Sequence, residues 1–221
     1  MFKNPPYDPV RDLAPVILAA KSPIAIVAGL DAPVSSFPTM IEFAKARPGV
    51  LTIGHAGIGS MAHMTAELIQ LKAGIRLNSV PYRGGPPLTT DLLGGHVELA
   101  SDLLSNFVRL AKDGKIRPLA VTSARRMGDL PDVPTVAEEL GSALEATAWF
   151  AIMAPAATPG DVIAKMNGIA NRYLQSAKGQ ELIARGAMEA GGGTPSELSA
   201  FIKAELEKWE PVISAGNFST N

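Results

Sequence analysis

The 221 residues are 47% hydrophobic, which is enough apolar material to fill the core of one large domain or two modest lobes. A net charge of -1 without any basic run argues against nucleic acid or an anionic membrane surface as the partner. The chain has no cysteine, so disulfides, thiolate metal sites and thiol catalysis are excluded.

The first half of the chain alternates short apolar runs with helical patterns. The predicted strands cover residues 24–27, 50–53, 77–82, 97–100 and 117–122. The predicted helices lie between Ser36 and Pro48, from Ser60 to about Ala73, around 88–93 and over 103–113. Strands that alternate with helices at this spacing predict an α/β architecture with a largely parallel sheet.

The second half is mainly helical. A loop-like segment, MGDLPDVPTVAEEL, precedes a predicted strand over 148–153. Helices are predicted over 163–176, 179–184 and 195–214, the last of them capped by Thr194. The first thirty and last seventy residues hold too few strands for a second sheet. Either these helices pack on the central α/β block, or a partner layer lies outside this chain.

A glycine-rich turn, GIGSMA at residues 57–62, fits the dinucleotide pattern G-x-G-x-x-[GA]. A dinucleotide fold also needs an acidic residue about 20 positions further on, to bind the ribose hydroxyls. The corresponding region, residues 77–83, has neither Asp nor Glu, and the Walker pattern is absent. The sequence therefore argues against a nucleotide cofactor, and no other cofactor motif emerges.

The same turn is suited to binding an anion without any nucleotide. A helix that starts at Ser60 presents free N–H groups and the positive end of its macrodipole, which serve carboxylates as well as phosphates. The alternative is that these glycines only make a tight strand-to-helix turn. Both interpretations stay open at this point.

Three other groups are candidates for a site. His63 is predicted to pack or to bond to the backbone rather than to bind metal, whereas His55 is less settled because it can point into a cleft. Asp102 ends the strand predicted over 97–100, where ligand-contacting residues of open sheets lie, but helix capping before Leu103 is the favoured role. Arg83 follows another strand and could clamp a carboxylate or stay solvated.

The sequence shows no candidate catalytic site. The sequence has no G-x-S-x-G elbow, no acid/base pair and no ligand spacing for a metal. Several glycine-rich turns instead follow successive strands, a pattern more typical of a binding protein than of an enzyme. The rival interpretation is an NAD(P)-dependent oxidoreductase that uses the GIGSMA turn, and a third is a module whose turn binds nothing.

A family resemblance runs nearly from end to end, in order and spacing. The chain resembles the Bug-type (TctC-like) substrate-binding proteins of tripartite tricarboxylate transporters. The blocks that carry the resemblance are YDPVRDLAPV, PGVLTIGHAGIGSMAH, VPYRGGPPLTTDLLGGHVELA, GKIRPLAVTSARR, LPDVPTVAEE, AWFAIMAPAATP and TPSELSAFIKAELEKW.

The resemblance implies a type II periplasmic binding protein-like fold with two lobes, joined by crossover strands, that close over a small carboxylate. It implies a periplasmic receptor that is not an enzyme and has no cofactor or metal, with transporter subunits as partners and no membrane insertion. Backbone N–H groups and waters would hold the ligand. The expected ligand-binding residues are Ala56, Gly57, Ile58, Gly59, Ser60, His63, Tyr82, Arg83, Gly84 and Asp102.

On this interpretation the second lobe is complete and the first is partial. Residues 1–30 form a remnant of lobe 1 with a crossover strand, 31–140 form lobe 2, and 141–221 form the return strand and the helices of lobe 1. The start of the chain has no apolar region typical of a signal peptide. The first-lobe carboxylate loop is also expected to be missing, so we expect weak binding by this chain alone.

One residue departs from the family pattern. His55 stands where the family usually has a small hydroxyl residue, a change that could alter the polarity of the pocket or the choice of ligand.

Overall fold

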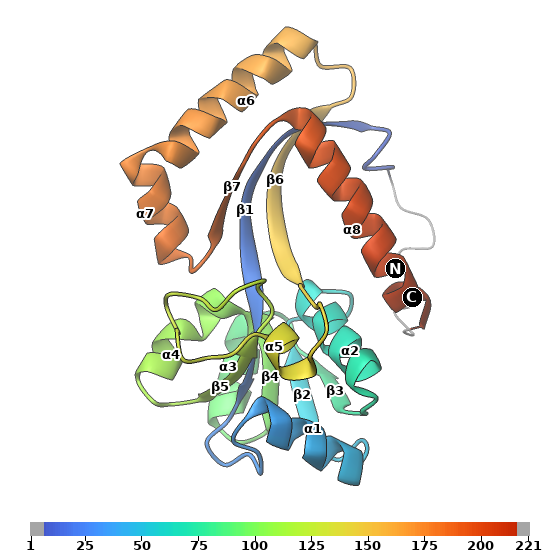
Figure 1. The fold of residues 1–221 in the computed structure, drawn as a ribbon, viewed down its shortest axis with the longest axis vertical. Coiled ribbons are helices and arrows are strands. Elements are labelled where there is room, and N and C mark those ends of the chain that lie inside the picture. The colour runs from blue at the N-terminus through green and yellow to red at the C-terminus, as the bar shows by residue number, and fades with distance from the viewer. Residues whose placement is uncertain (1–6, 216–221) are drawn as a thin grey trace. The chain divides into compact units, whose positions relative to one another are not determined.

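A computed structural model describes residues 7–215. The chain divides into two compact units: a central unit, Pro23–Ala148, and a terminal unit, Met1–Ser22 with Trp149–Asn221. Strand β1 (Leu13–Ala28) contributes residues to both units (Figure 1). Residues 1–6, part of the segment on which the signal-peptide expectation rests, lie outside the described residues.

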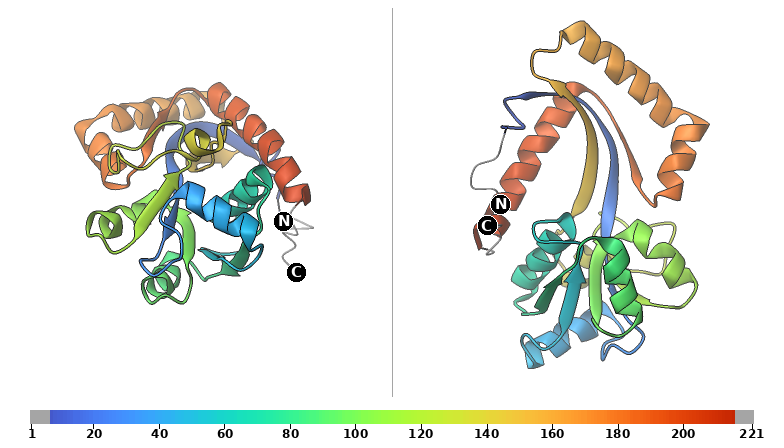
Figure 2. Two further views of the ribbon diagram at one scale, coloured as in Figure 1. Left: turned by 60° about the horizontal axis from the view of Figure 1, so that its bottom comes forward. Right: turned by 180° about the vertical axis from the view of Figure 1, so that it is seen from behind.

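The central unit is a five-stranded sheet covered by helices (Figures 1 and 2). The strand order is β3-β2-β4-β1-β5. After the second half of β1, the elements in chain order are α1 (Phe37–Ala46), β2 (Thr52–His55), α2 (Met61–Ala73), β3 (Asn78–Pro81), α3 (Gly85–Leu93), β4 (Leu99–Leu103), the 3₁₀ turn η1 (Leu104–Asn106), α4 (Val108–Lys112), β5 (Arg117–Val121) and α5 (Val136–Leu140).

The sheet is mixed, so the prediction of a largely parallel sheet is wrong in part. Strand β2 runs parallel to both β3 and β4, as βαβ units require, but β1 runs antiparallel to both β4 and β5. The carboxyl ends of β2, β3 and β4 consequently meet at one edge of the sheet. The glycine-rich loop follows β2 at this edge.

Helices α2 and α3 lie on opposite faces of this sheet, as the alternation of side chains along each strand shows. Ser101 of β4 donates a hydrogen bond to the Ala62 carbonyl of α2. The next residue, Asp102, faces α3, because a Cβ on Gly85 would lie 2.8 Å from its Oδ2. The chain therefore crosses from one face to the other between α2 and α3, and the strand order reverses between β2 and β4, the place where open α/β sheets generally bind ligands.

Local capping signals set several helix boundaries as predicted. Ser36 makes a reciprocal capping box with Thr39 at the start of α1. Ser60 caps α2, and Gly74 ends that helix in the left-handed conformation. Thr194 caps α8 (Pro195–Ala215) by accepting the N–H of Glu197.

The terminal unit is built around the first half of β1. Strand β6 (Thr147–Pro155) and strand β7 (Glu189–Gly192) both pair with β1. Helix α6 (Gly160–Gln175) packs on Val16 and Ile17, and α7 (Ala177–Arg185) follows it. The Trp149 ring meets Phe201 of α8 edge-on at 5.6 Å, while the Trp209 indole N–H donates to Glu205 within α8.

Several predicted boundaries need correction. Strand β1 starts eleven residues before the predicted 24–27 core, and β4 covers 99–103 rather than 97–100. The predicted helix over 103–113 is a 3₁₀ turn and a short helix, beginning only after Leu103. Strand β7 was not predicted, and α5 forms inside the segment predicted to be a loop.

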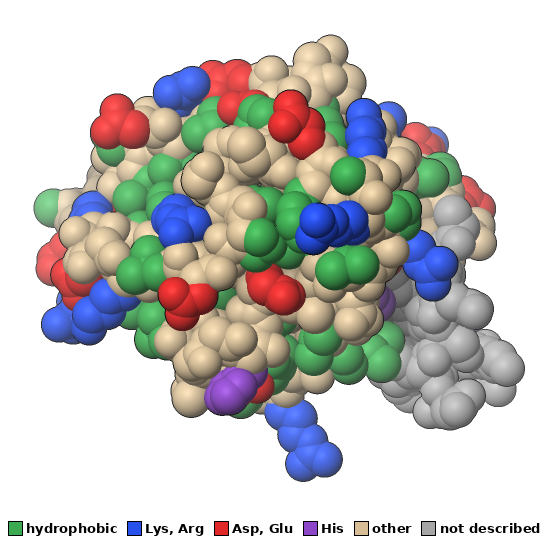
Figure 3. Space-filling model, turned by 90° about the horizontal axis from the view of Figure 1, so that it is seen from below, with side chains coloured by type: hydrophobic (Ala, Val, Ile, Leu, Met, Phe, Trp, Pro, Cys, Tyr) green, Lys and Arg blue, Asp and Glu red, His purple; other side chains and the backbone are tan. Residues whose placement is uncertain are grey.

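Two properties of the surface bear on possible partners. No helix within residues 7–215 combines the length and the apolar character needed to cross a bilayer. On the face shown in Figure 3, Lys and Arg side chains are interspersed with Asp and Glu. This mixed face lacks the one-sign stripe that binds a nucleic-acid backbone.

Candidate functional site

The glycine-rich loop, residues 56–60, joins β2 to α2. Gly57 and Gly59 adopt φ angles of 124° and 74°, a region that side chains rarely allow. The Ser60 N–H donates to the Gly57 carbonyl at 3.1 Å and closes the turn. Ile58, at the tip, is 51% exposed. The loop predicted from the sequence therefore forms and opens to solvent.

The start of α2 provides unused donors. The Ser60 hydroxyl accepts the His63 N–H, but within residues 7–215 no acceptor pairs with the N–H groups of Met61 and Ala62. Free N–H groups at the first turn of a 13-residue helix carry the positive end of its macrodipole. This arrangement is suited to a carboxylate oxygen.

The connection from β3 to α3 lies beside this loop. The Tyr82 N–H donates to the His55 carbonyl at 2.9 Å, and a Cβ on Gly57 would lie 3.6 Å from the Tyr82 carbonyl. Gly84, with φ 99°, precedes α3, and Arg83 is exposed. The structure thus brings residues 82–84 next to residues 56–60, as strand order predicts.

The side chain of Tyr82 is already engaged. Its hydroxyl donates to the Asp91 carboxylate of α3 at 2.9 Å. Burial, together with the hydrogen bond and the charge of Asp91, raises the pKa of Tyr82 to about 12. The Tyr82 hydroxyl therefore links the β3–α3 connection to helix α3.

Asp102 does not occupy the position expected of it. It lies inside β4, so Leu103 rather than Asp102 is the residue that precedes the 3₁₀ turn, and the predicted capping position is wrong by one residue. Its carboxylate accepts the Leu103 N–H and the Asn106 side-chain amide, and it is only 4% exposed. Burial raises the pKa of Asp102, although both hydrogen bonds oppose the shift.

The two histidines beside the loop form a stacked pair. Their ring centroids are 4.1 Å apart and the planes are inclined by 13°. His55 is 1% exposed, so it lies behind the loop and does not open into a cleft as the sequence allowed. Nδ1 of His63 accepts the Gly59 N–H, as expected of a residue that bonds to the backbone. Burial lowers the pKa of both, and the neighbouring ring helps to lower that of His55 to about 4.

Metal binding has no support in the described part of the chain. Residues 7–215 contain no group of three His, Asp or Glu side chains arranged to hold an ion. The donors that residues 7–215 leave free here are backbone N–H groups at the start of α2, beside the connection at residues 82–84.

Comparison with known proteins identifies the family. Residues 1–218 match the profile described as the tripartite tricarboxylate transporter family receptor, TctC. The chain belongs to this family. It is 34% identical to BugT of Bordetella pertussis over 208 residues, covering 94% of this chain and 64% of BugT. It spans about two thirds of the length of most of the curated relatives that it matches.

Solved TctC-like structures confirm the periplasmic binding protein-like fold. R. palustris Rpa4515 with adipate superimposes with a TM-score of 0.88 at 34% identity, covering 97% of this chain and 72% of that one. MatC from Rhodopseudomonas palustris, with bound malate, gives a TM-score of 0.82 at 26% identity, covering 96% and 73%.

The sequence alone did not predict the residues that lie behind the glycine-rich loop. Glu67 and Gln70 continue from His63 along α2, and Ser101 ties α2 to β4. The spacing of His63, Glu67 and Gln70 places them on one side of a helix, which was a usable signal. Nothing in the sequence indicates that His55 stacks on this row.

Proposed function

We propose that this chain is a solute-binding protein that captures a small carboxylate and delivers it to the membrane subunits of a tripartite tricarboxylate transporter. The observation that carries the proposal is the first turn of α2, where the N–H groups of Met61 and Ala62 have no acceptor among the described residues. These donors sit beside a glycine loop at the carboxyl edge of the sheet. The adipate and malate bound to two structural neighbours support a dicarboxylate as the ligand class.

The proposed ligand residues are the ten expected from the sequence, with different roles. The donors are the backbone N–H groups of the first turn of α2 and those of the loop, residues 56–60, apart from Gly59 and Ser60, whose N–H groups are bonded within the protein. Exposed Arg83 adds a cation, while Tyr82 and Gly84 shape the adjoining connection. His63 and Asp102 act from behind, since both are bonded within the protein.

The same proposal makes the protein a periplasmic receptor without catalytic activity. The matched family is described as a receptor, and a further neighbour, BugD, is described as a periplasmic binding protein. The oxidoreductase alternative has no acidic residue to bind a ribose in residues 77–83.

A titration followed by NMR tests the proposal, because amide shifts also report weak binding. Adipate or malate added to the ¹⁵N-labelled chain should move the amide signals of Ile58, Met61 and Ala62 most. The uncharged diamide of adipic acid and NAD should leave these signals in place. Equal shifts with the diamide, or no shift with any carboxylate, would contradict carboxylate capture by this loop.

A matched pair of glycine variants localises the effect. Gly59→Val puts a branched side chain at φ 74° inside the loop, whereas Gly114→Val imposes similar strain at φ 66°, where nothing lies within 4 Å of a new Cβ. We expect the carboxylate-induced shifts to disappear in the first variant and to persist in the second. Shifts retained by Gly59→Val would move the binding site away from this loop.

A further inference from the structure

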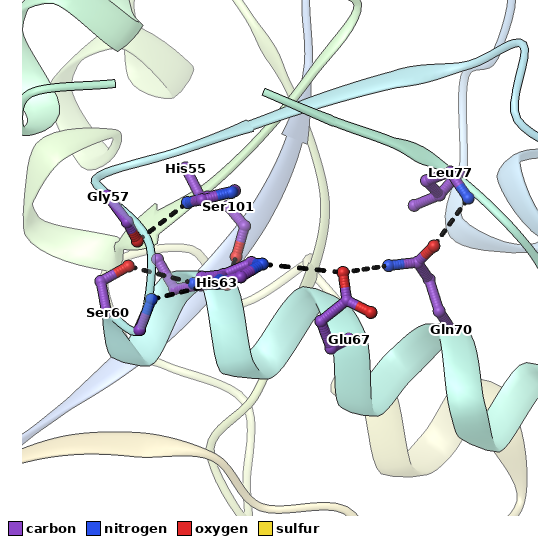
Figure 4. Close-up of polar contacts among 10 residues, drawn as sticks. His55, Gly57, Ser60, His63, Glu67, Gln70, Leu77 and Ser101 are labelled. Carbon is purple, nitrogen blue, oxygen red and sulfur yellow. Dashed lines mark hydrogen bonds and ion pairs between the residues drawn. The ribbon is translucent and has the colours of Figure 1, made fainter. Parts of the chain in front are cut away.

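The two stacked histidines contact the backbone of the glycine loop (Figure 4). One ring contacts a carbonyl group of the loop and the other contacts a backbone N–H group. His55 Nδ1 lies 3.0 Å from the Gly57 carbonyl oxygen, which can only accept, so His55 carries its proton on Nδ1. His63 Nδ1 lies 3.1 Å from the Gly59 nitrogen, whose N–H can only donate, so this Nδ1 is unprotonated. His63 is therefore neutral with its proton on Nε2, and His55, whose pKa is lowered to about 4, is neutral near pH 7 with its proton on Nδ1.

A row of polar groups lies along α2 beside the His63 ring. With Nδ1 unprotonated, the proton lies on Nε2, which is 3.8 Å from Oε1 of Glu67. The Gln70 side-chain amide donates to that same oxygen at 2.9 Å. Gln70 in turn accepts the Leu77 N–H at 2.7 Å, just before β3. The row thus connects the start of β3 with the glycine loop.

We propose that His63 is a positioning residue for the carboxylate loop, which holds the Gly59 N–H inward and so fixes the shape in which the loop presents its other donors to the ligand. The inference rests on the proposed function for its consequence in binding, but not for its consequence in loop conformation. His55 supports the same geometry by fixing Gly57 and by packing against the face of the His63 ring. Glu67, which accepts a hydrogen bond from Gln70, lies 3.8 Å from Nε2 of the same ring.

The proposal has a consequence for pH. A protonated imidazole has a hydrogen on both nitrogens, so it cannot accept the Gly59 N–H, and this tether is lost. Burial lowers the pKa of His63 and keeps the ring neutral near neutral pH. We therefore expect the loop to loosen as the pH falls through the pKa of His63.

The groups that surround His63 act in opposite directions. A charged Glu67 favours the protonated ring, although burial raises the pKa of Glu67, and a charged His55 on β2 opposes it. From β4 the residue on this face is Ser101, which does not titrate in this range. The acidic neighbours on the opposite face are engaged elsewhere, Asp102 with Asn106 and Asp91 with Tyr82.

Amide hydrogen exchange of Gly59, measured by NMR across pH without ligand, tests the positioning role. His63→Asn keeps a neutral acceptor close to the place of Nδ1, whereas His63→Phe keeps the ring and removes the acceptor. We expect His63→Phe to raise the exchange rate relative to the intrinsic rate by about tenfold at neutral pH. In the wild type, acidification should likewise remove the protection of the Gly59 amide from exchange. His63→Asn should keep this protection without such a pH dependence.

Glu67→Gln provides an independent variant that leaves the loop contacts in place. Removing its charge should shift the acid loss of Gly59 protection by about half a pH unit to lower pH. Unchanged Gly59 exchange in a folded His63→Phe, or an acid loss in His63→Asn equal to the wild type, would overturn the proposal. If His63→Phe does not fold, His63→Asn and Glu67→Gln decide.

A carboxylate titration of the same variants separates this inference from the proposed function. If the exchange results hold and adipate moves no signal at any pH, the positioning role of His63 stands and carboxylate capture fails. If adipate binds equally well to the wild type and to a folded His63→Phe, capture stands and the positioning role fails.

Discussion

The central and terminal units differ sharply in how they bury their apolar side chains. Of the twelve largest fully buried side chains among residues 7–215, eleven belong to the central unit and one, Ile17, belongs to the terminal unit. The central sheet has helices on both faces, and its glycine loop is held by buried polar groups. The loop therefore stands on the densely packed part of the molecule, as an accurately shaped binding site requires.

The terminal unit exposes apolar surface instead. A groove of about 480 Å³ lies between its strands and helices α6 and α7, and only apolar atoms line it. The lining residues include Phe150 and Ile152 of β6, with Tyr173 and Leu182, each at least 40% exposed. The comparison teaches that one chain can combine a well-packed α/β unit with a unit whose apolar faces stay in water.

The largest loss of stability is expected from a side chain added at Gly54, where β2 packs closely against neighbouring side chains. A Cβ on Gly54 would lie 2.3 Å from Leu88 and 2.9 Å from the Tyr82 ring. We expect Gly54→Val to lower the free energy of unfolding by about 3 kcal/mol or more, because β2 and α3 would have to separate. Urea unfolding followed by circular dichroism measures the loss.

Gly128→Ala is the matched control in the same unit, since nothing lies within 4 Å of its new Cβ. We expect this variant to stay within about 0.5 kcal/mol of the wild type. Equal stabilities of the two variants would contradict the tight packing described for the central unit.

A smaller effect is expected from acid. Burial and His63 lower the pKa of His55 to about 4, against 6.5 in the unfolded chain, so the unfolded state takes up more protons between these values. The stability from this group is complete above pH 6.5 and is lost as the pH falls toward 4. We expect a loss of about 2 kcal/mol between pH 7 and 4.5 from His55 alone.

Urea unfolding at the two pH values measures this loss. His55→Phe keeps a ring against His63 and should remove most of the pH-dependent difference, although it also gives up the bond to Gly57. His96→Gln replaces an exposed histidine outside the stacked pair and serves as the control. An equal acid loss in His55→Phe would assign the effect to other groups.

The smallest change in stability is expected in the terminal unit. Leu182→Glu alters a side chain that is 54% exposed, so the free energy of unfolding should change by no more than about 0.5 kcal/mol. Its effect should appear in association, because the charge interrupts the apolar groove. Sedimentation velocity at increasing concentration should show less self-association than the wild type. Identical profiles would show that the groove is not a contact between copies.

Local signals in the sequence predicted local structure well. Ser60 and Gly74 marked both ends of α2, because a cap depends on residues within one turn. The glycine loop and its neighbour at residues 82–84 followed from strand order. The family resemblance predicted the periplasmic binding protein-like fold class, which solved structures confirm.

Features that depend on distant pairing were not predictable from local patterns. Asp102 lies inside β4, and not at the start of a helix as predicted, because β4 continues to Leu103, which pairs with Ile24 of β1. Strand β7, EAGG, has no apolar alternation, and it forms because β1 offers a partner, with Leu18 opposite Gly192. The stacking of His55 on His63 likewise requires β2 and α2 to be packed together.

The placement of the two tryptophans has an optical consequence. Trp149, edge-on to Phe201, and Trp209, bonded to Glu205, both belong to the terminal unit, and the chain has no others. Tryptophan fluorescence therefore reports on the terminal unit alone. The central unit, which carries the glycine loop, contributes no tryptophan fluorescence. A ligand that changes this emission would reveal that occupation of the loop is felt in the terminal unit, without any dye being attached.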